Sequence, residues 1–293
     1  MSTLGRFLLF ALLLVVSCPA LTGQVRKKIP VPQIDRQWEE TKDGLWEWKK
    51  YDHKCDHCKT AKTRTCEYCE GADWVKCQAC KGKKVATCRL CAGAGKLADP
   101  LVSMMCPYCD GMNWHPCGLC HGKGSFPVKG GGKKEQACSA CKKAGSHACK
   151  ACKGKHHILV VKVGKKGIGN ASSKDLKKAR KVLQKALDEV TKLKFTSNES
   201  KSLKLFKAPL KKPAKILPVL KDMEKLLVTS LKGLRKGSSY VAYPEWVLAE
   251  FHHFQDKTIY LLRYQILLID ICLKRAEHNE AIEAKLEAEK KKD

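Results

Sequence analysis

Sixteen of the 18 cysteines in this sequence fall into eight C-x-x-C pairs. A two-residue gap lets one turn of backbone direct both thiolates at a single cation, and two such turns supply the four ligands of a closed, tetrahedral zinc site. The paired residues are Cys55/Cys58, Cys66/Cys69, Cys77/Cys80, Cys88/Cys91, Cys106/Cys109, Cys117/Cys120, Cys138/Cys141 and Cys149/Cys152. We therefore expect these cysteines to be metal ligands that hold about four structural Zn²⁺ ions.

The competing chemistry for these cysteines is disulfide formation, which is common in exported proteins. A disulfide closed within C-x-x-C encloses a very short loop and removes little entropy from the unfolded chain. Disulfide frameworks usually join distant cysteines at irregular spacing, whereas these pairs are regular. The pattern therefore favours zinc over disulfides.

Seven histidines lie in or beside the paired region and are also metal-ligand types. They are His53, His57, His115, His121, His147, His156 and His157. Because sixteen cysteines already complete four sites, we interpret these histidines as surface imidazoles.

The paired region repeats internally. The segment Cys66–Gly82 matches the segment Cys106–Gly122, which places Trp74 and Trp114 at equivalent positions, where we expect them to cover the metal sites. Glycine follows the second cysteine by two residues in six of the eight pairs, at Gly71, Gly82, Gly93, Gly111, Gly122 and Gly154. Backbone that wraps a metal needs a positive φ at this point, and glycine adopts it without steric cost.

Two pairs carry the longer form C-x-x-C-x-G-x-G, in Cys88-Arg-Leu-Cys91-Ala-Gly93-Ala-Gly95 and Cys117-Gly-Leu-Cys120-His-Gly122-Lys-Gly124. At these residues the region resembles the cysteine-rich zinc-binding domain of DnaJ-type co-chaperones and small stand-alone proteins with the same repeat. The resemblance covers about a third of the chain. It implies structural zinc, and grooves beside the knuckles that hold extended apolar segments of client proteins.

The chain also departs from this family. It lacks a J domain with a His-Pro-Asp loop, since His115-Pro116 runs directly into Cys117, so stimulation of a partner chaperone's ATPase is not carried over. Cys58 and Cys141 lack the following glycine, and eight pairs stand where the family has four. Two schemes for sharing ions stay open. Neighbouring pairs combine, or, as the resemblance implies, the first pair joins the fourth and the second joins the third.

The first twenty residues are typical of a secretory signal peptide. Arg6 supplies the positive charge, residues 7–16 are apolar, and Cys18-Pro19-Ala20 is a small-residue cleavage context. The apolar run is too short to cross a membrane. Residues 15–18 also match a bacterial lipobox, the alternative in which Cys18 is lipidated and attaches the protein peripherally to a membrane. Both alternatives predict an extracytoplasmic protein, periplasmic or secreted.

The remaining chain divides by composition. Residues 21–52 are expected to be a linker, whose tryptophans Trp38, Trp46 and Trp48 cap the first knuckle or form an interaction patch. Residues 53–163 should form small metal-stabilised β-hairpin and zinc-knuckle repeats, because each repeat is too short and polar to build a core. A Gly/Lys hinge at residues 164–171 precedes an all-α helical bundle at residues 172–293.

Periodic apolar residues mark three helices in the last part of the chain, which we expect to form a three- or four-helix bundle. The first is capped by Ser172 or Ser173, the second is closed by Gly237, and the longest starts at Pro244. Their apolar positions are Leu176, Ala179, Leu183, Ala186, Val190 and Leu193, then Leu220, Met223, Leu227, Leu231 and Leu234, and finally Leu248, Phe251, Gln255, Ile259, Leu262, Ile266, Ile269 and Leu273. We expect Cys272 to be a buried, inert thiol, and residues 274–293 to fray or extend the helix.

The chain is strongly basic, with a formal net charge of +28 at pH 7. A net −2 on each Cys₄ zinc site would leave much of that charge, which attracts anionic surfaces or polymers. No specific nucleic-acid-binding signature with stacking aromatics is present. The sequence therefore predicts protein partners or polypeptide clients, with anionic surfaces or polymers as additional partners.

Three functions compete on these observations. The first is a non-enzymatic, zinc-scaffolded protein-interaction module that binds unfolded or partner polypeptides as a chaperone does, without catalytic residues. The second is a thiol–disulfide oxidoreductase, which requires an exposed cysteine of low pKa in a thioredoxin-like context that the sequence does not contain. The third is an envelope-associated polyanion or nucleic-acid binder, supported by charge alone. We favour the first.

Overall fold

The computed structural model of the protein describes residues 38–49, 54, 59, 61–65, 85–87, 93–94, 96, 99–112, 114–116, 125–127, 135–137, 146–164, 167–237 and 243–291. The chain divides into two compact units, Met1–Pro32 and Gln33–Asp293, and all the described residues belong to the second. The predicted signal peptide and Cys18 lie outside the described residues.

Within the described part of the chain, the strands form five two-stranded antiparallel ladders. They pair β1 (Trp38–Glu40) with β2 (Trp46–Trp48), β3 (Thr63–Thr65) with β4 (Val85–Thr87), β5 (Ser103–Met105) with β10 (His157–Leu159), β6 (Trp114–Pro116) with β9 (Ser146–Ala148), and β7 (Ser125–Pro127) with β8 (Glu135–Ala137). The ladders between β5 and β10 are nested, because β7 pairs with β8, β6 with β9 and β5 with β10. Segments distant in sequence therefore lie together.

The ladders define two repeats, which we call module A (residues 54–96) and module B (residues 103–159). In module A, Lys54 bridges Lys96, just as Met105 pairs with His157 in module B. Lys54 and Met105 each directly precede the first cysteine of their module, and Lys96 and His157 each lie five residues beyond its last cysteine. The outer ladder therefore has the same register in both modules.

The inner ladders repeat in the same way. β3 and β6 each end immediately before the second cysteine pair of their module, and β4 and β9 each end immediately before the fourth. The registers Thr63↔Thr87 and Trp114↔Ala148 coincide on this alignment. On this alignment Trp114 corresponds to Thr63. The sequence repeat had instead matched Trp114 with Trp74, which lies outside the described residues.

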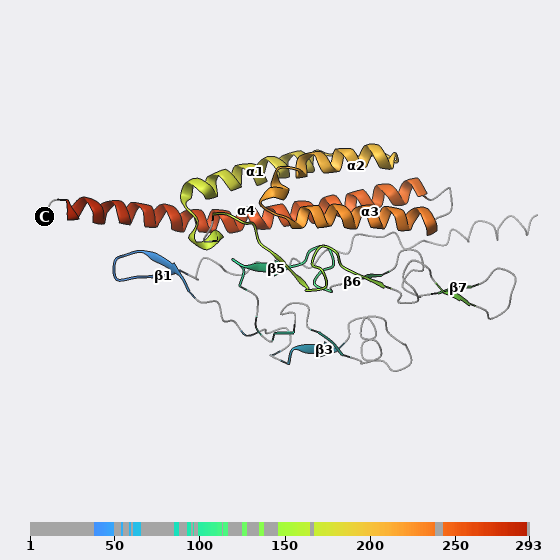
Figure 1. The fold of residues 1–293 in the computed structure, drawn as a ribbon, viewed down its shortest axis with the longest axis horizontal. Coiled ribbons are helices and arrows are strands. Elements are labelled where there is room, and N and C mark those ends of the chain that lie inside the picture. The colour runs from blue at the N-terminus through green and yellow to red at the C-terminus, as the bar shows by residue number, and fades with distance from the viewer. Residues whose placement is uncertain are drawn as a thin grey trace, which may run out of the picture. The chain divides into compact units, whose positions relative to one another are not determined.

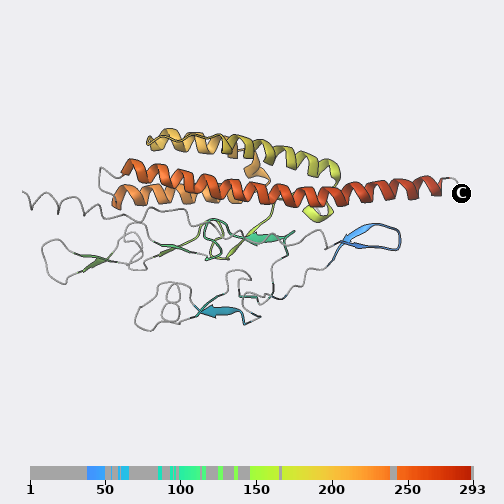
Figure 2. The same ribbon diagram turned by 180° about the vertical axis from the view of Figure 1, so that it is seen from behind.

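The helices follow module B. They are α1 (Ser173–Thr191), α2 (Glu199–Lys207), α3 (Val219–Gly237) and the 48-residue α4 (Tyr243–Lys290), with short 3₁₀ turns η3 (Ile168–Asn170), η4 (Ala208–Leu210) and η5 (Pro213–Lys215). Helix α4 contacts both α1 and α3 (Figure 1), and the view from behind in Figure 2 shows the same arrangement. This part of the chain is therefore mostly α-helical, with four helices in the described residues.

The predicted helix boundaries are confirmed. The Ser172 side chain caps α1 by accepting a hydrogen bond from the Asp175 amide at 3.2 Å, α3 ends at Gly237, and α4 begins at Tyr243, one residue before Pro244. The charged tail extends α4 as far as Lys290. Helix α2 was not predicted, because a short lysine-rich stretch carries little apolar periodicity.

The tryptophan segment expected as a linker contains the β1–β2 hairpin, which packs on the last part of α4. Trp46 stacks on His278 with ring centroids 4.0 Å apart. Its amide donates to Asn279 Oδ1 at 2.8 Å, and Asn279 Nδ2 donates to the Trp46 carbonyl at 2.9 Å. The guanidinium of Arg275 lies over the Trp38 ring. In the structure these tryptophans therefore contact α4.

Buried apolar side chains from module B and from the helices belong to one continuous hydrophobic core. Cys272 lies in it, 1% exposed, and burial raises the pKa of its thiol to about 12, as expected for an inert cysteine. Among the residues that the structure describes, no helix is long and apolar enough to cross a lipid bilayer.

Candidate metal centre

Four cysteines of module B converge at one point in the core. Cys106, Cys109, Cys149 and Cys152 are each 4% exposed or less, and their sulfur atoms all lie within 4.8 Å of one another. The Sγ atoms of Cys106 and Cys149 are 3.9 Å apart, and those of Cys109 and Cys152 are 3.7 Å apart. The first pair of the module thus meets the fourth, which is the nested scheme at this site.

This arrangement fits a structural zinc ion. A regular tetrahedron with zinc–sulfur bonds of about 2.3 Å has sulfur–sulfur edges of about 3.8 Å, which agrees with the two measured separations. Four thiolates are one of the ligand sets that structural Zn²⁺ sites use. If a zinc ion is bound, the four sulfurs fill its coordination sphere. The ion then holds together the two metal-binding turns, which we call the first knuckle (residues 106–111) and the second knuckle (residues 149–154).

The backbone of each knuckle turns just after its second cysteine, as the glycine pattern predicts. Gly111 and Gly154 have φ values of 72° and 76°, in the left-handed region that glycine adopts at no steric cost. This turn lets the Gly111 amide donate to the Cys106 carbonyl at 3.1 Å, and the Lys155 amide donate to the Cys152 carbonyl at 2.9 Å. Both knuckles therefore satisfy their own backbone groups around the sulfurs.

The cysteine thiols of the cluster change one another's pKa values. The pKa of Cys106 lies far above its ordinary range, because its thiol is hydrogen-bonded first to Cys109 and then to Cys149 and Cys152, and because it is buried. The pKa of Cys152 is instead lowered to about 7, because the thiols of Cys106 and Cys109 donate hydrogen bonds to its sulfur. A divalent ion that binds here must therefore displace protons from the thiols whose pKa is raised, Cys106 and Cys109.

Tyr108, which lies between the two cysteines of the first knuckle, anchors this knuckle to the helices. Its side chain is 1% exposed, and its ring stacks on Phe254 of α4 with centroids 6.1 Å apart. Its hydroxyl lies 3.5 Å from the hydroxyl of Thr258, which donates to the Phe254 carbonyl at 2.7 Å and lies 4.0 Å from the sulfur of Met223 in α3. Tyr108 therefore inserts where α3 and α4 meet.

Two buried polar side chains of α4 bind the backbone of module B and of the segment that directly follows it. Lys257, 4% exposed, donates from Nζ to the Tyr108 carbonyl at 2.8 Å and lies 3.5 Å from a carboxylate oxygen of Asp110. Gln265, fully buried, accepts a hydrogen bond from the Val161 amide at 2.8 Å. These contacts satisfy polar groups that burial would otherwise leave unpaired, so they fix the position of the module on the helix.

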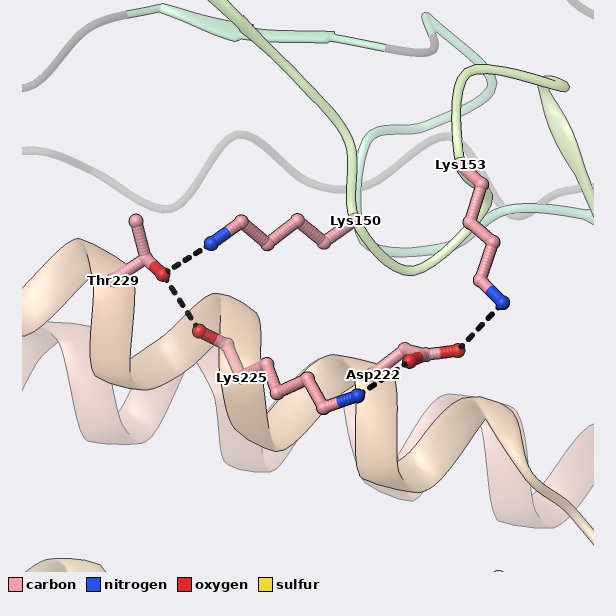
Figure 3. A network of polar contacts seen from close by, with 5 residues as sticks. All are labelled: Lys150, Lys153, Asp222, Lys225 and Thr229. Carbon is pink, nitrogen blue, oxygen red and sulfur yellow. Dashed lines mark hydrogen bonds and ion pairs between the residues drawn. The ribbon is translucent and has the colours of Figure 1, made fainter.

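The second knuckle contacts α3 through exposed polar side chains. Figure 3 shows Lys150 donating to the Thr229 hydroxyl at 2.8 Å, and Lys153 forming an ion pair of 3.8 Å with Asp222, which also pairs with Lys225. The Lys153 side chain is 71% exposed, so this pair adds little to the free energy of folding. Tyr108 of the first knuckle therefore makes buried contacts with the helices, whereas Lys150 and Lys153 of the second knuckle make solvated ones.

The other predicted ligands lie outside the described residues: Cys55, Cys58, Cys66, Cys69, Cys77, Cys80, Cys88, Cys91, Cys117, Cys120, Cys138 and Cys141. The same is true of His53, His57 and His121. His147 is exposed, as predicted for a surface imidazole. His156 is instead half-buried, with Nδ1 2.6 Å from the Gly111 carbonyl, and its own carbonyl accepts from the Cys106 amide at 2.9 Å. It joins the two knuckles, a role that sequence spacing alone does not indicate.

Comparison with family models, with curated proteins and with solved structures found no match in any of the three. The residues themselves establish a buried Cys₄ cluster suited to a metal such as zinc, set among small hairpins and followed by a mostly α-helical region.

Proposed function

We propose that the protein is a non-enzymatic, zinc-scaffolded module that binds extended segments of unfolded or partner polypeptides. The observation that carries this proposal is that each ladder in the described residues has only two strands, so each strand has one edge with no described strand paired to it. Such edges offer backbone donors and acceptors to an added strand. Next to them, Leu159 of β10 is 60% exposed and Val102, beside β5, is 57% exposed.

The metal centre supports a scaffolding role. Four buried thiolates leave a zinc ion no open coordination position at which water or a substrate would be activated. The same burial disfavours thiol–disulfide exchange, which needs an accessible thiolate. We therefore assign the cysteines to structure, and the hairpins they hold to binding.

We extend the zinc assignment to the whole paired region on the basis of the module alignment. Lys59, which follows Cys58, has a φ of 46°, close to the 48° of Asp110 after Cys109. Gly93 has a φ of 78°, close to the 76° of its counterpart Gly154. Because registers and knuckle backbones repeat, we propose that Cys55, Cys58, Cys88 and Cys91 form a second outer site. The inner pairs of each module would then complete four zincs, as in the DnaJ-type cysteine-rich domain that the region resembles.

The proposal is tested by binding and by suppression of aggregation, using the full zinc-replete chain and a chemically unfolded client. We expect Leu159→Lys to weaken client binding, because it places a charge beside a strand edge to which no described strand is paired. The matched control is Leu267→Lys, at a leucine of α4 that is 40% exposed and far from the ladders in sequence. Equal effects of the two variants, or absence of client binding at full zinc occupancy, would refute the proposal.

A further inference from the structure

Two of the four asparagines in the sequence begin the pattern Asn-x-Ser, in which x is any residue except proline. The two motifs are Asn170-Ala171-Ser172 and Asn198-Glu199-Ser200. This pattern is the acceptor for N-linked glycosylation in proteins that enter a secretory compartment, where the glycan occupies a surface position. Because so short a pattern also arises by chance, the structure around each asparagine decides whether it can carry a glycan.

Both asparagines are exposed in the folded protein, and each lies where irregular backbone leads into a helix. Asn170 is the last residue of η3, two residues before the residue that caps α1, and Asn198 is the cap of α2. Asn279 is the opposite case. It is buried, its side chain makes two hydrogen bonds to the Trp46 backbone, and it does not begin the pattern. Within the described residues the pattern therefore coincides with exposure.

The two motifs have the same orientation on the protein. In each, the middle residue faces the protein, and the asparagine and serine beside it are exposed. Ala171 is buried, and the carboxylate of Glu199 accepts a hydrogen bond from Nε of Arg235 in α3 at 2.8 Å. A glycan on either asparagine would thus extend into solvent without displacing a core side chain.

Glycosylation is compatible with the helix caps at both motifs. Asn198 Oδ1 accepts a hydrogen bond from the Lys201 amide at 2.9 Å. An N–H group can bond only the oxygen of a side-chain amide, so this contact leaves Nδ2 out of the cap. Glycosylation replaces one hydrogen of Nδ2 and leaves Oδ1 as an acceptor, so the cap of α2 is retained. At the other motif the cap of α1 is Ser172 Oγ, and the sugar is carried by a different side chain.

We propose that Asn170 and Asn198 are N-glycosylated when the chain enters a secretory compartment. In the transfer, Nδ2 forms a bond to C1 of the first sugar of an oligosaccharide carried on a polyprenyl diphosphate. The bond from C1 to the diphosphate oxygen breaks, that oxygen keeps the bonding electron pair, and Nδ2 gives up one proton as the polyprenyl diphosphate leaves. The sites stand at the two ends of α1, whose 19 residues span about 28 Å. The inference requires export, which the first twenty residues predict, and is independent of client binding.

The test expresses the full chain in cultured mammalian cells, in parallel with a chain whose first twenty residues are replaced by the signal peptide of a known secreted protein. Each product is treated in heavy-oxygen water with an amidase that releases N-linked glycans and converts the asparagine that carried each glycan to a labelled aspartate. Peptide mass spectrometry should find the label at Asn170 and Asn198. The buried Asn279 is the internal control and should stay unlabelled.

Variants separate the two sites. Asn170→Gln removes the first motif at an exposed side chain, and Ser200→Ala removes the second while leaving the Asn198 cap in place. Each variant should lose one glycan, seen as one step of gel mobility, and their combination should lose both. The matched control Ser200→Thr keeps the pattern and should keep both glycans.

The proposal is overturned if the chain with the foreign signal peptide is secreted without label at either asparagine. It is also overturned if the natural chain stays in the cytosol without a glycan while the other chain is labelled; the export prediction then fails although both motifs are competent acceptors. A label at one asparagine alone would refute the assignment of the other, and unchanged gel mobility of Ser200→Ala would refute that of Asn198.

Discussion

Replacing Tyr108 tests whether the first knuckle is anchored by a single aromatic side chain. The informative substitution is Tyr108→His, because the equivalent residue of module A is His57. The alignment thus provides a residue that is found between two knuckle cysteines elsewhere in this chain. We expect the variant to retain the Cys₄ cluster while losing its anchor between α3 and α4.

The magnitude follows from the contacts of the ring. Removing a buried aromatic side chain altogether costs about 3–5 kcal/mol. Histidine keeps a smaller ring but brings nitrogens into a site where the hydroxyl partner of Tyr108, Thr258, already donates to the Phe254 carbonyl at 2.7 Å. An unsatisfied buried polar group costs about 1–3 kcal/mol, so we expect Tyr108→His to lower the free energy of unfolding by about 2–4 kcal/mol. The control Tyr108→Phe removes only a 3.5 Å contact and should cost about 0.5 kcal/mol.

The assay is urea unfolding of zinc-loaded protein, followed by far-ultraviolet circular dichroism, with zinc content measured beforehand. With a slope of roughly 3 kcal/mol per M, typical of a large unit, the midpoint should fall by about 1 M for Tyr108→His and change little for Tyr108→Phe. The reasoning is wrong if the free energy of unfolding of Tyr108→His lies within about 0.5 kcal/mol of that of the unaltered protein while the variant retains zinc. It is also wrong if both variants are equally destabilised.

Three further predictions follow from the same contacts. Asn279→Ala removes the two hydrogen bonds that Asn279 makes to the Trp46 backbone, whereas Arg275 Nε still donates to the Trp46 carbonyl at 2.8 Å. The variant should loosen the β1–β2 hairpin on α4 at a cost of about 1–3 kcal/mol, seen as changed tryptophan fluorescence; an unchanged spectrum would contradict it. Asp222→Asn breaks the ion pairs of Asp222 with Lys153 and Lys225, two lysines whose side chains are exposed, and should change stability by less than about 1 kcal/mol in urea unfolding. A larger loss would be a failure of this reasoning. Lowering the pH should weaken zinc binding by about tenfold per pH unit for each proton displaced, because protons return to the thiols whose pKa is raised, Cys106 above all. Competition with a chelating dye measures the zinc affinity at each pH, and an affinity that does not depend on pH would count against zinc thiolate ligation.

The sequence predicts which residues converge at the described site, but not which pairs combine. Spacing within Cys106/Cys109 or Cys149/Cys152 is local, since one turn of backbone decides it. Which pair meets which is decided by the ladders β5–β10 and β6–β9, whose short strands carry no alternating pattern of their own. Neighbour pairing and nested pairing therefore have the same local signature, and only the long-range register distinguishes them.

The difference between local and long-range information also explains which features of the helical region could be predicted from the sequence. Helices α1, α3 and α4 are marked by apolar residues three and four positions apart, so their boundaries can be predicted. The buried polar residues of α4 behave differently. Gln265 interrupts an apolar run, and its role appears only when its partner, the Val161 amide, is brought to it from 104 positions away. A polar residue within an apolar helix face thus indicates a buried contact without identifying the partner.

Differences between the two modules explain why the helices contact module B as they do. The helix surface presents Lys257 to the Tyr108 carbonyl and to the carboxylate of Asp110. At the corresponding positions module A has His57 and Lys59, so a polar ring would replace the buried aromatic and a positive charge would face a buried positive charge. The Lys257 side chain is buried, so a second positive charge at this half-exposed position would repel it, which disfavours docking of module A at the same place. The differences between Tyr108 and His57 and between Asp110 and Lys59 therefore both favour module B as the repeat that binds the helices.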